Sequence, residues 1–286
     1  MAPYDLGRES VGSGRGPEAL VGGGAVKALA TRGREVTVTT ATRDAPFTDE
    51  LGAVVDVDRV VAGIVATARR SGSLPLVAAG NCNVSLGVHA GLAAAAPGDP
   101  PAVIWLDAHG DFNTPETTPT GYLDGMPLAM LTGRAHREVW AALGAAPLDE
   151  RLVLHAGGRD LDPDEAEALA LSDVLVVAGG ELKGHVRERL GPALDALVRR
   201  TRARAVGRPA AYLHVDIDVL DPEAAPGVTF PCPGGLALAE LLASIALIRE
   251  RFELRAVSLS SFTPDNDRRD LTLRAGLSVL KAAAAS

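Results

Sequence analysis

Metal-binding side chains alternate in the five-residue segment that begins at Asp107. In an extended segment, alternate residues point to the same side, so Asp107, His109 and Asp111 would face a common point. Asp216 and Asp218 repeat this spacing further along the chain. Carboxylates in a shared pocket repel one another unless cations neutralise them. An oxygen-rich set with one imidazole suits Mn²⁺ better than Zn²⁺, and the pattern therefore predicts a manganese site.

Both acidic clusters directly follow a short apolar run that is typical of a buried strand. A lone Asp-x-Asp pair is usually a solvated turn, whereas this placement favours metal binding. The predicted strands are Glu35–Thr40, Leu74–Ala78, Ala102–Leu106, Leu152–His155, Val174–Val177, Ala210–Val215 and Leu254–Leu259. The predicted helices are Asp56–Arg70, Arg134–Leu143, Asp164–Leu171, Leu182–Ala203, Ala237–Arg251 and Arg268–Ala285. This alternation predicts an α/β fold with a mostly parallel sheet and helices on both faces.

Four predicted strand ends carry polar or reactive side chains. Asp107, Asp216, Cys82 and Ser261 all lie just beyond such an end. Ligands of open parallel sheets bind outside the carboxyl ends of the strands. We therefore expect these four residues to converge on one crevice.

Composition excludes several other classes of protein. The 286 residues carry a formal net charge of −8 without a basic stripe, which disfavours nucleic-acid binding. The cysteines, Cys82 and Cys232, do not make a disulfide framework. No signal peptide or membrane span is visible. We expect a cytoplasmic protein with one domain over residues 1–286 and with no nucleic-acid or membrane partner.

Several segments resemble the arginase or ureohydrolase family. Residues 106–113 resemble its D-A-H-x-D signature, and residues 215–222 resemble its D-x-D-x-x-D-P signature. Residues 121–127 and 80–83 resemble its H-G-M-P and G-G-D-H loops. The match covers nearly the whole chain and implies a three-layer α/β/α, arginase-like fold.

The resemblance also implies roles for the acidic clusters. Asp107 and Asp216 would bridge two metal ions, His109 and Asp218 would complete the shell of one ion, and Asp111 would bind the other. These residues would activate a water that attacks the guanidino carbon of a small-molecule guanidino amino acid. The family resemblance further implies a homo-oligomer, either a trimer or a hexamer.

Three positions depart from the family pattern. Cys82 replaces the histidine ligand of the G-G-D-H loop, and Asp124 replaces the histidine of the H-G-M-P loop, which has a proton-shuttle role. Ser261 replaces the glutamate of the E-V-N-P segment, which holds the guanidinium. Cys82 is either a buried core residue or a weak thiolate ligand. In both cases the second metal loses an imidazole, so we expect one firmly bound Mn²⁺ and a second ion that is weak or absent.

The change at Ser261 bears on the substrate. A guanidinium is a permanent cation whose buried charge a carboxylate compensates, whereas serine offers only a neutral hydroxyl. An N-hydroxyguanidine is a weaker base and needs less counter-charge. The pair Cys82 and Ser261 is similar to the pattern of the Nω-hydroxy-L-arginine amidinohydrolases of D-cycloserine-type antibiotic biosynthesis. This resemblance implies hydrolysis of Nω-hydroxy-L-arginine to hydroxyurea and L-ornithine.

Another segment indicates an α-amino-acid substrate. Residues 157–165 resemble the arginase G-x-R-D-x-D-x-x-E stretch, in which Asp162 and Glu165 match the residues that face the α-ammonium. Asn113 and Thr120 match arginase positions that hold the α-carboxylate. Asp162 before a proline is also typical of a helix start, and both roles can hold together. These matches favour an arginase-like pocket over an agmatinase-like one.

Two other functions stay open at this level. One is an arginase, agmatinase or other guanidino-acid ureohydrolase that tolerates Cys82 and Ser261. The other is an inactive oligomeric family member with a binding role, although a cluster of unused buried acids argues against it. His155 and His214 lie in predicted strands near the site, and His155 is the better candidate for lining the pocket.

Overall fold

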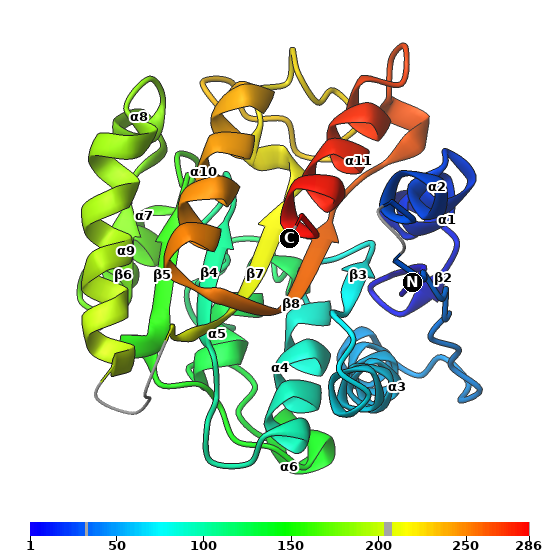
Figure 1. Ribbon diagram of the computed structural model, residues 1–286. Coiled ribbons are helices and arrows are strands. Elements are labelled where there is room, and N and C mark those ends of the chain that lie inside the picture. Colours follow the sequence, from blue (N-terminus) through cyan, green and yellow to red (C-terminus); the bar gives the residue numbers. More distant parts are fainter. Residues whose placement is uncertain (32–33, 203–207, 286) are drawn as a thin grey trace.

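A six-stranded parallel sheet with the order β3-β8-β7-β4-β5-β6 forms the centre of the fold (Figure 1). The computed structural model describes residues 1–31, 34–202 and 208–285. The strands are β3 Leu76–Ala78, β4 Ala102–Leu106, β5 Val153–Ala156, β6 Leu175–Val177, β7 Ala210–Asp216 and β8 Glu253–Ser260. Near the N-terminus, β1 Tyr4–Asp5 and β2 Arg8–Glu9 form a separate antiparallel pair. The α/β fold with a parallel sheet is therefore confirmed.

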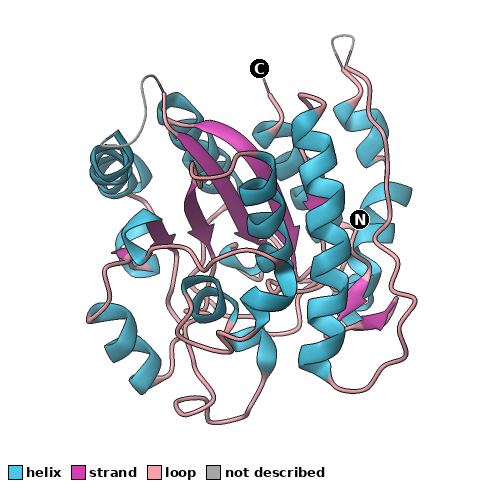
Figure 2. Ribbon diagram, turned by 90° about the horizontal axis from the view of Figure 1, so that it is seen from below, coloured by secondary structure: helices cyan, strands magenta, loops and turns pink. Residues whose placement is uncertain are grey.

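Helices cover both faces of this sheet (Figure 2). One layer contains α3 Glu50–Arg70, α4 Val84–Ala95, α5 Pro127–Thr132, α6 Val139–Leu143 and α7 Pro163–Ala170. The other contains α1 Gly16–Gly22, α2 Ala25–Leu29, α8 Gly179–Leu182, α9 Val186–Arg202, α10 Leu238–Arg251 and α11 Leu271–Ala283. Among the described helices, none is both long and apolar enough to cross a membrane.

Strand β4 shows why the central strands are apolar throughout. Val103 and Trp105 pack into the hydrophobic cluster on the α3–α7 side, whereas Ile104 and Leu106 pack into the cluster on the α9–α11 side. Successive side chains of a strand point to opposite faces, and both faces here are covered. The sheet is therefore the middle layer of a three-layer sandwich.

The predicted strand Glu35–Thr40 is wrong. These residues form no strand and are largely exposed. Met1 donates to the carbonyl oxygen of Thr39 and accepts the N–H of Ala41. Ala2 instead forms the bridge to Ala79, just beyond edge strand β3. The β-branched residues of this segment therefore have no sheet partner.

Several helix bounds also differ from the prediction. Helix α3 begins at Glu50 rather than Asp56, because Asp49 caps it by accepting the N–H of Gly52 at 2.7 Å. The predicted helix from Arg134 is helical only from Val139, since the backbone turns through a left-handed residue at His136. The predicted helix Leu182–Ala203 is divided into α8 and α9, and its last residue lies outside the described part of the chain.

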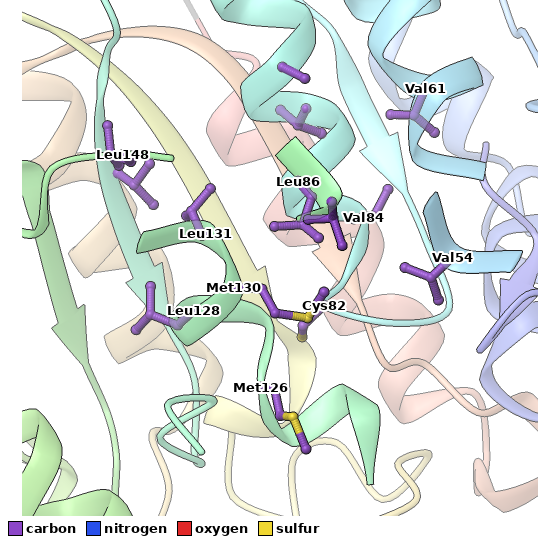
Figure 3. Packing of buried hydrophobic residues seen from close by; sticks show 14 of the residues in the cluster. Val54, Val61, Cys82, Val84, Leu86, Met126, Leu128, Met130, Leu131 and Leu148 are labelled. Carbon is purple, nitrogen blue, oxygen red and sulfur yellow. The ribbon is translucent and has the colours of Figure 1, made fainter. Parts of the chain in front are cut away.

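Helix α4 positions the loop that contains Cys82. Gly87 and Gly91 let α3 approach closely, because a Cβ at either position would lie 2.6 Å from a backbone oxygen of α3. Figure 3 shows Cys82 at the start of this apolar region, with Val84 and Leu86 of α4. The close packing of α3 on α4 fixes the loop against the carboxyl edge of the sheet.

Candidate metal centre

The carboxyl ends of the central strands meet at one edge of the sheet. In the strand register, Leu106 of β4 pairs with Val215 of β7, and Asp216 pairs with the last residue of β8. Asp107 directly follows the last residue of β4, and Ser261 directly follows the last residue of β8. Adjacent strands thus bring these side chains together, as the sequence predicts for an open parallel sheet.

Asp107, His109 and Asp218 form a first candidate metal-binding group, called here the His109 group. One ligand atom from each residue lies within 4.8 Å of the others. The Nδ1 atom of His109 is 3.1 Å from Asp218 Oδ2 and 3.6 Å from Asp107 Oδ1. The Asp107 carboxylate is fixed because Oδ2 accepts the indole N–H of Trp105 at 3.0 Å and Oδ1 accepts the backbone N–H of His109 at 2.7 Å.

The charges of this group favour a cation between its carboxylates. Burial raises the pKa of Asp218, and repulsion from Asp107 raises it further. Burial also acts to raise the pKa of Asp107, but the contacts with His109 outweigh it and lower that pKa to about 2. For His109, burial lowers the pKa, yet the bonds to both carboxylates outweigh it and raise the pKa to about 12. The carboxylates thus favour a positive charge at this point.

Cys82, Asp107 and His214 form a second group with ligand atoms within 4.8 Å of one another, called here the Cys82 group. The Cys82 thiol lies 3.0 Å from Asp216 Oδ2, to which it donates, and 3.1 Å from Ser260 Oγ. Burial raises the pKa of this thiol well above its ordinary value, and the Asp216 charge adds to that effect. Cys82 is therefore both a buried residue of the hydrophobic cluster and a polar contact of the site.

Asp111 lies outside both groups, and its backbone is not extended as predicted. It has a left-handed φ of 51°, and its carbonyl oxygen accepts the N–H groups of Leu128 and Ala129 at the start of α5. Its buried Oδ2 has no hydrogen-bond partner among the described residues. Burial raises its pKa, and repulsion from Asp107 adds to this. A buried carboxylate with a free oxygen beside other acids fits a site for a divalent cation.

Asp216 also lies outside both groups, although it contacts each of them. Its Oδ1 accepts the backbone N–H of Asp218 at 2.9 Å, and its Oδ2 accepts the hydroxyl of Ser261. Ser261 has a left-handed φ of 67°, and its N–H donates to the carbonyl oxygen of Gly80 at 3.0 Å. This strained conformation turns the serine hydroxyl toward the carboxylates of the site.

Asp124 is bound by the loop on either side of Cys82. Its Oδ2 accepts the amide N–H of Asn81 at 2.8 Å, and its Oδ1 accepts the amide N–H of Asn83 at 2.8 Å. Burial raises the pKa of Asp124 to about 8, although these hydrogen bonds act to lower it. Asp124 therefore stabilises the Cys82 loop and is able to change its protonation near neutral pH.

The residues predicted for the amino-acid end divide into two kinds. The Asn113 amide donates to Asp162 Oδ2 at 2.9 Å, which places these side chains together. Glu165 is buried, and its oxygens accept the backbone N–H groups of Phe112 and Asp162 at 2.8 and 3.2 Å. Thr120 is exposed, and its hydroxyl oxygen accepts the backbone N–H of Tyr122 in its own loop.

The structure places two further residues in or beside the candidate metal-binding groups, and the sequence did not favour either of them as a site residue. His214 is brought to Cys82 and Asp107, whereas the favoured His155 is fully buried and bonds the backbone carbonyl oxygen of His109 at 2.7 Å. Arg159 joins two loops of the site by donating to the carbonyl oxygens of Asp218 and Cys232, each at 2.8 Å. The sequence signal that could have identified Arg159 is its position in the G-x-R-D stretch, residues 157–160.

An aromatic pair borders the His109 group. Phe230 is 51% exposed, and its ring centroid is 6.4 Å from that of His109 and 5.4 Å from that of Tyr122. No spacing in the sequence connects these three residues. The rings of Phe230 and Tyr122 form an apolar border beside His109 and the charged ligands of its group.

Comparisons with known proteins agree with this architecture. The sequence model of the Arginase family matches residues 1–285. The arginase of Brevibacillus brevis is 31% identical over 98% of this chain and 94% of its own length. A crystal structure of arginase from Bacillus cereus superposes with a TM-score of 0.86 at 27% identity, covering 100% of this chain and 96% of that one. The arginase of Entamoeba histolytica in complex with L-ornithine has the same fold, with a TM-score of 0.86 at 23% identity over 99% of this chain and 95% of that one.

Proposed function

The chain belongs to the Arginase family and is thus a hydrolase of C–N bonds in linear amidines, and from that premise we propose that it cleaves Nω-hydroxy-L-arginine to hydroxyurea and L-ornithine with Mn²⁺. The observation that carries the substrate proposal is the position of Ser261. By sequence resemblance this residue aligns with the family's glutamate, so we infer that a neutral group replaces a charged one there. The hydroxyl of Ser261 donates to Asp216, which places it beside the candidate metal ligands. The proposed place in D-cycloserine-type antibiotic biosynthesis follows from the same departure.

The charge of the guanidino group explains the proposed preference. A carboxylate that faces a guanidinium forms a charge-assisted bidentate contact, which a serine hydroxyl cannot replace. The electron-withdrawing oxygen of an N-hydroxyguanidine lowers its basicity, so that it enters the site at a smaller desolvation cost. Its additional oxygen also gives the Ser261 hydroxyl a neutral hydrogen-bond partner.

The opposite end of the site supports an α-amino acid as substrate. Asn113 and Asp162 are joined by a hydrogen bond and offer an amide and a carboxylate to one ligand. We propose that Asp162 binds the α-ammonium and that Asn113 binds the α-carboxylate. Glu165 supports the same end of the site, because its carboxylate accepts the backbone N–H groups of Phe112 and Asp162. Thr120 supports it indirectly, by accepting the backbone N–H of Tyr122 within its own loop. L-Ornithine, the proposed product, is bound by the Entamoeba histolytica relative.

The metal site serves the reaction through its buried carboxylates. We propose that Asp107, His109, Asp216 and Asp218 hold one firmly bound Mn²⁺, and that a second Mn²⁺ near Asp111 binds weakly or not at all. A divalent ion in such a site lowers the pKa of a water and fixes its direction. Trp105 and the backbone of His109 keep the Asp107 carboxylate in place.

Asp124 is the proposed proton carrier of the guanidino end. Its raised pKa of about 8 allows it to take up and release a proton near neutral pH. The amides of Asn81 and Asn83 hold its carboxylate in a fixed orientation. We further propose that residues 1–286 form one domain and that copies of the chain assemble into a trimer or hexamer.

A direct comparison of substrates tests the proposed function. The purified protein with Mn²⁺ is given L-arginine, Nω-hydroxy-L-arginine or agmatine, and ornithine or putrescine is measured. We expect the highest kcat/KM with Nω-hydroxy-L-arginine and release of hydroxyurea. Preference for L-arginine would identify an arginase, preference for agmatine an agmatinase, and no turnover of any of them a binding role.

A further inference from the structure

His214 is a fully buried histidine that the proposed reaction does not use. Its ring stacks on Trp105 with a centroid distance of 3.8 Å and an interplanar angle of 29°. Its Nδ1 atom is 2.7 Å from Ser258 Oγ, which is itself 2.6 Å from the hydroxyl of Tyr212. Three neighbouring side chains thus hold the ring in one orientation.

The other ring nitrogen of His214 lacks a partner. Nε2 is buried and has no hydrogen-bond partner among the described residues. A buried polar atom without a partner destabilises the fold, so its presence in a native structure calls for an explanation such as a bound ion. A ring nitrogen of His214 lies within 4.8 Å of ligand atoms of Cys82 and Asp107. In a metal-binding histidine, one ring nitrogen is usually fixed by an outer partner and the other binds the ion. Here Ser258 fixes Nδ1, which leaves Nε2 as the nitrogen that could bind an ion.

We propose that Cys82, Asp107 and His214 bind a Zn²⁺ ion, beside the Mn²⁺ of the His109 group. One sulfur, one nitrogen and one oxygen donor match the ligands of tetrahedral zinc sites with an open fourth position. Thiolate ligands select softer ions than the oxygen-rich donor set of the His109 group does. His214 thus supplies an imidazole beside the position where Cys82 replaces one.

The proposal rests on the proposed function only in that Asp107 is shared by both ions. The two oxygens of Asp107 are differently placed, because one is fixed by Trp105 and the other by the backbone of His109. A carboxylate with separately oriented oxygens can serve two ions. Zinc binding would release the thiol proton of Cys82, whose present acceptor is Asp216.

His89 and Cys232 provide matched controls for this site. His89 is also buried, its Nδ1 also lacks a partner among the described residues, and its ring packs edge-on against Trp140 at 5.4 Å. It belongs to neither candidate metal-binding group of the described residues. Cys232 is partly exposed and donates only to a neighbouring backbone oxygen at 3.7 Å. Burial of a histidine or presence of a thiol alone therefore does not create the arrangement.

Titration of the metal-stripped full chain with Co²⁺ tests the proposal. We expect a near-ultraviolet thiolate-to-cobalt band that saturates as Co²⁺ is added and disappears when Zn²⁺ is added. Cys82→Ser should abolish the band, and His214→Asn should weaken Zn²⁺ binding at least about 100-fold. His89→Asn and Cys232→Ser should leave both unchanged. Absence of the band from the wild-type chain, or unaltered Zn²⁺ affinity in a folded His214→Asn protein, would overturn the zinc site.

X-ray absorption on the zinc-loaded wild-type chain avoids the risk that a variant does not fold. We expect one sulfur scatterer at about 2.3 Å and nitrogen or oxygen scatterers at about 2.0–2.1 Å. A shell without sulfur would overturn the proposal. The zinc site and the proposed substrate can be rejected independently of each other. A zinc signature together with a preference for L-arginine rejects only the proposed substrate. Turnover of Nω-hydroxy-L-arginine without a sulfur ligand rejects only the zinc site.

Discussion

The two ends of the site differ in how closely they keep the family's residues. At the amino-acid end, Asn113 and Asp162 match arginase positions and are joined by a hydrogen bond of 2.9 Å. At the proposed guanidino end, the sequence resemblance aligns Cys82, Asp124 and Ser261 with family residues of ligation, proton transfer and substrate charge, and all three differ from the family pattern. The end that we propose for amino-acid recognition thus keeps the family pattern, whereas the end that we propose for the guanidino group departs from it. This difference indicates a substrate that keeps the arginine backbone and alters the guanidino group.

The largest effect is expected from a residue that both metal-binding groups share. Asp107→Asn removes a charge from the His109 group and from the Cys82 group at once. We expect metal affinity to fall at least about 100-fold and turnover to be lost, because ligand changes exceed the 10–100-fold effect of outer-shell changes. Metal analysis after dialysis and a turnover assay check this. If Asp107→Asn kept both metal ions and full turnover, Asp107 would not be a metal ligand of the reaction.

A substitution at the amino-acid end should affect binding more than chemistry. Asp162→Asn replaces the proposed partner of the α-ammonium while keeping a side chain that can bond Asn113. We expect KM for Nω-hydroxy-L-arginine to rise about 10–100-fold, the range of a lost charge-assisted hydrogen bond, with a smaller change in kcat. Steady-state kinetics measure both. An unchanged KM would show that this end does not bind the α-ammonium.

The stability of the metal-free protein should depend on pH through the guanidino end. Because the pKa of Asp124 is raised to about 8, the folded chain keeps a proton that the unfolded chain releases near pH 4. This contribution is fully present below about pH 4 and is lost as the pH rises through about 8. Near pH 6.5 the buried histidines with lowered pKa values act in the opposite direction, because the unfolded chain still binds protons there. A comparison with a variant of Asp124 is therefore needed to isolate its contribution.

Urea unfolding with a chelator measures this slope. We expect the free energy of unfolding to fall by at most about 1.4 kcal/mol per pH unit between pH 6.5 and 8 on account of Asp124. Asp124→Asn should remove that contribution while keeping an acceptor for the Asn81 and Asn83 amides. A slope that is equal in both proteins would show that Asp124 does not hold this proton.

The smallest effect is expected at Thr120. This residue is exposed and bonds only within its own loop, although its position in the sequence matches the amino-acid end. Thr120→Ala should change KM and the free energy of unfolding by no more than about 0.5 kcal/mol, about twofold in KM. Kinetics beside Asp162→Asn provide the comparison. A tenfold rise in KM would place Thr120 in contact with the substrate and extend the retained end.

Sequence alone was enough to predict the central strands of the sheet, because β4 and β5 are buried on both faces. The range Ala102–Leu106 agrees at both ends with β4, whose apolar run has no polar interruption. Glu35–Thr40 is richer in β-branched residues than this strand, but composition does not supply a pairing partner. The edge of a sheet can pair with more than one segment, and composition does not say which one. Here Ala2 forms a bridge to Ala79, just beyond the edge strand β3.

The site shows the same limit. Spacing brought Asp107, His109 and Asp218 to one point, because neighbouring parallel strands end together. Spacing did not predict the left-handed backbone of Asp111, which depends on contacts with α5. It also favoured His155 over His214. Which of two buried strand histidines faces the site depends on the positions of Trp105 and Cys82, which come from other elements.

The preference between two substrates before and after restoring the guanidino end tests the central claim most directly. The measurement is the ratio of kcat/KM for Nω-hydroxy-L-arginine to that for L-arginine, in the wild-type chain and in Cys82→His with Ser261→Glu. Ser261→Ala serves as the control that removes the hydroxyl without adding charge. We predict a wild-type ratio above one that falls at least about tenfold in the double variant, the equivalent of one charge-assisted contact. A wild-type preference for L-arginine, or a ratio that the double substitution leaves unchanged, would contradict the account.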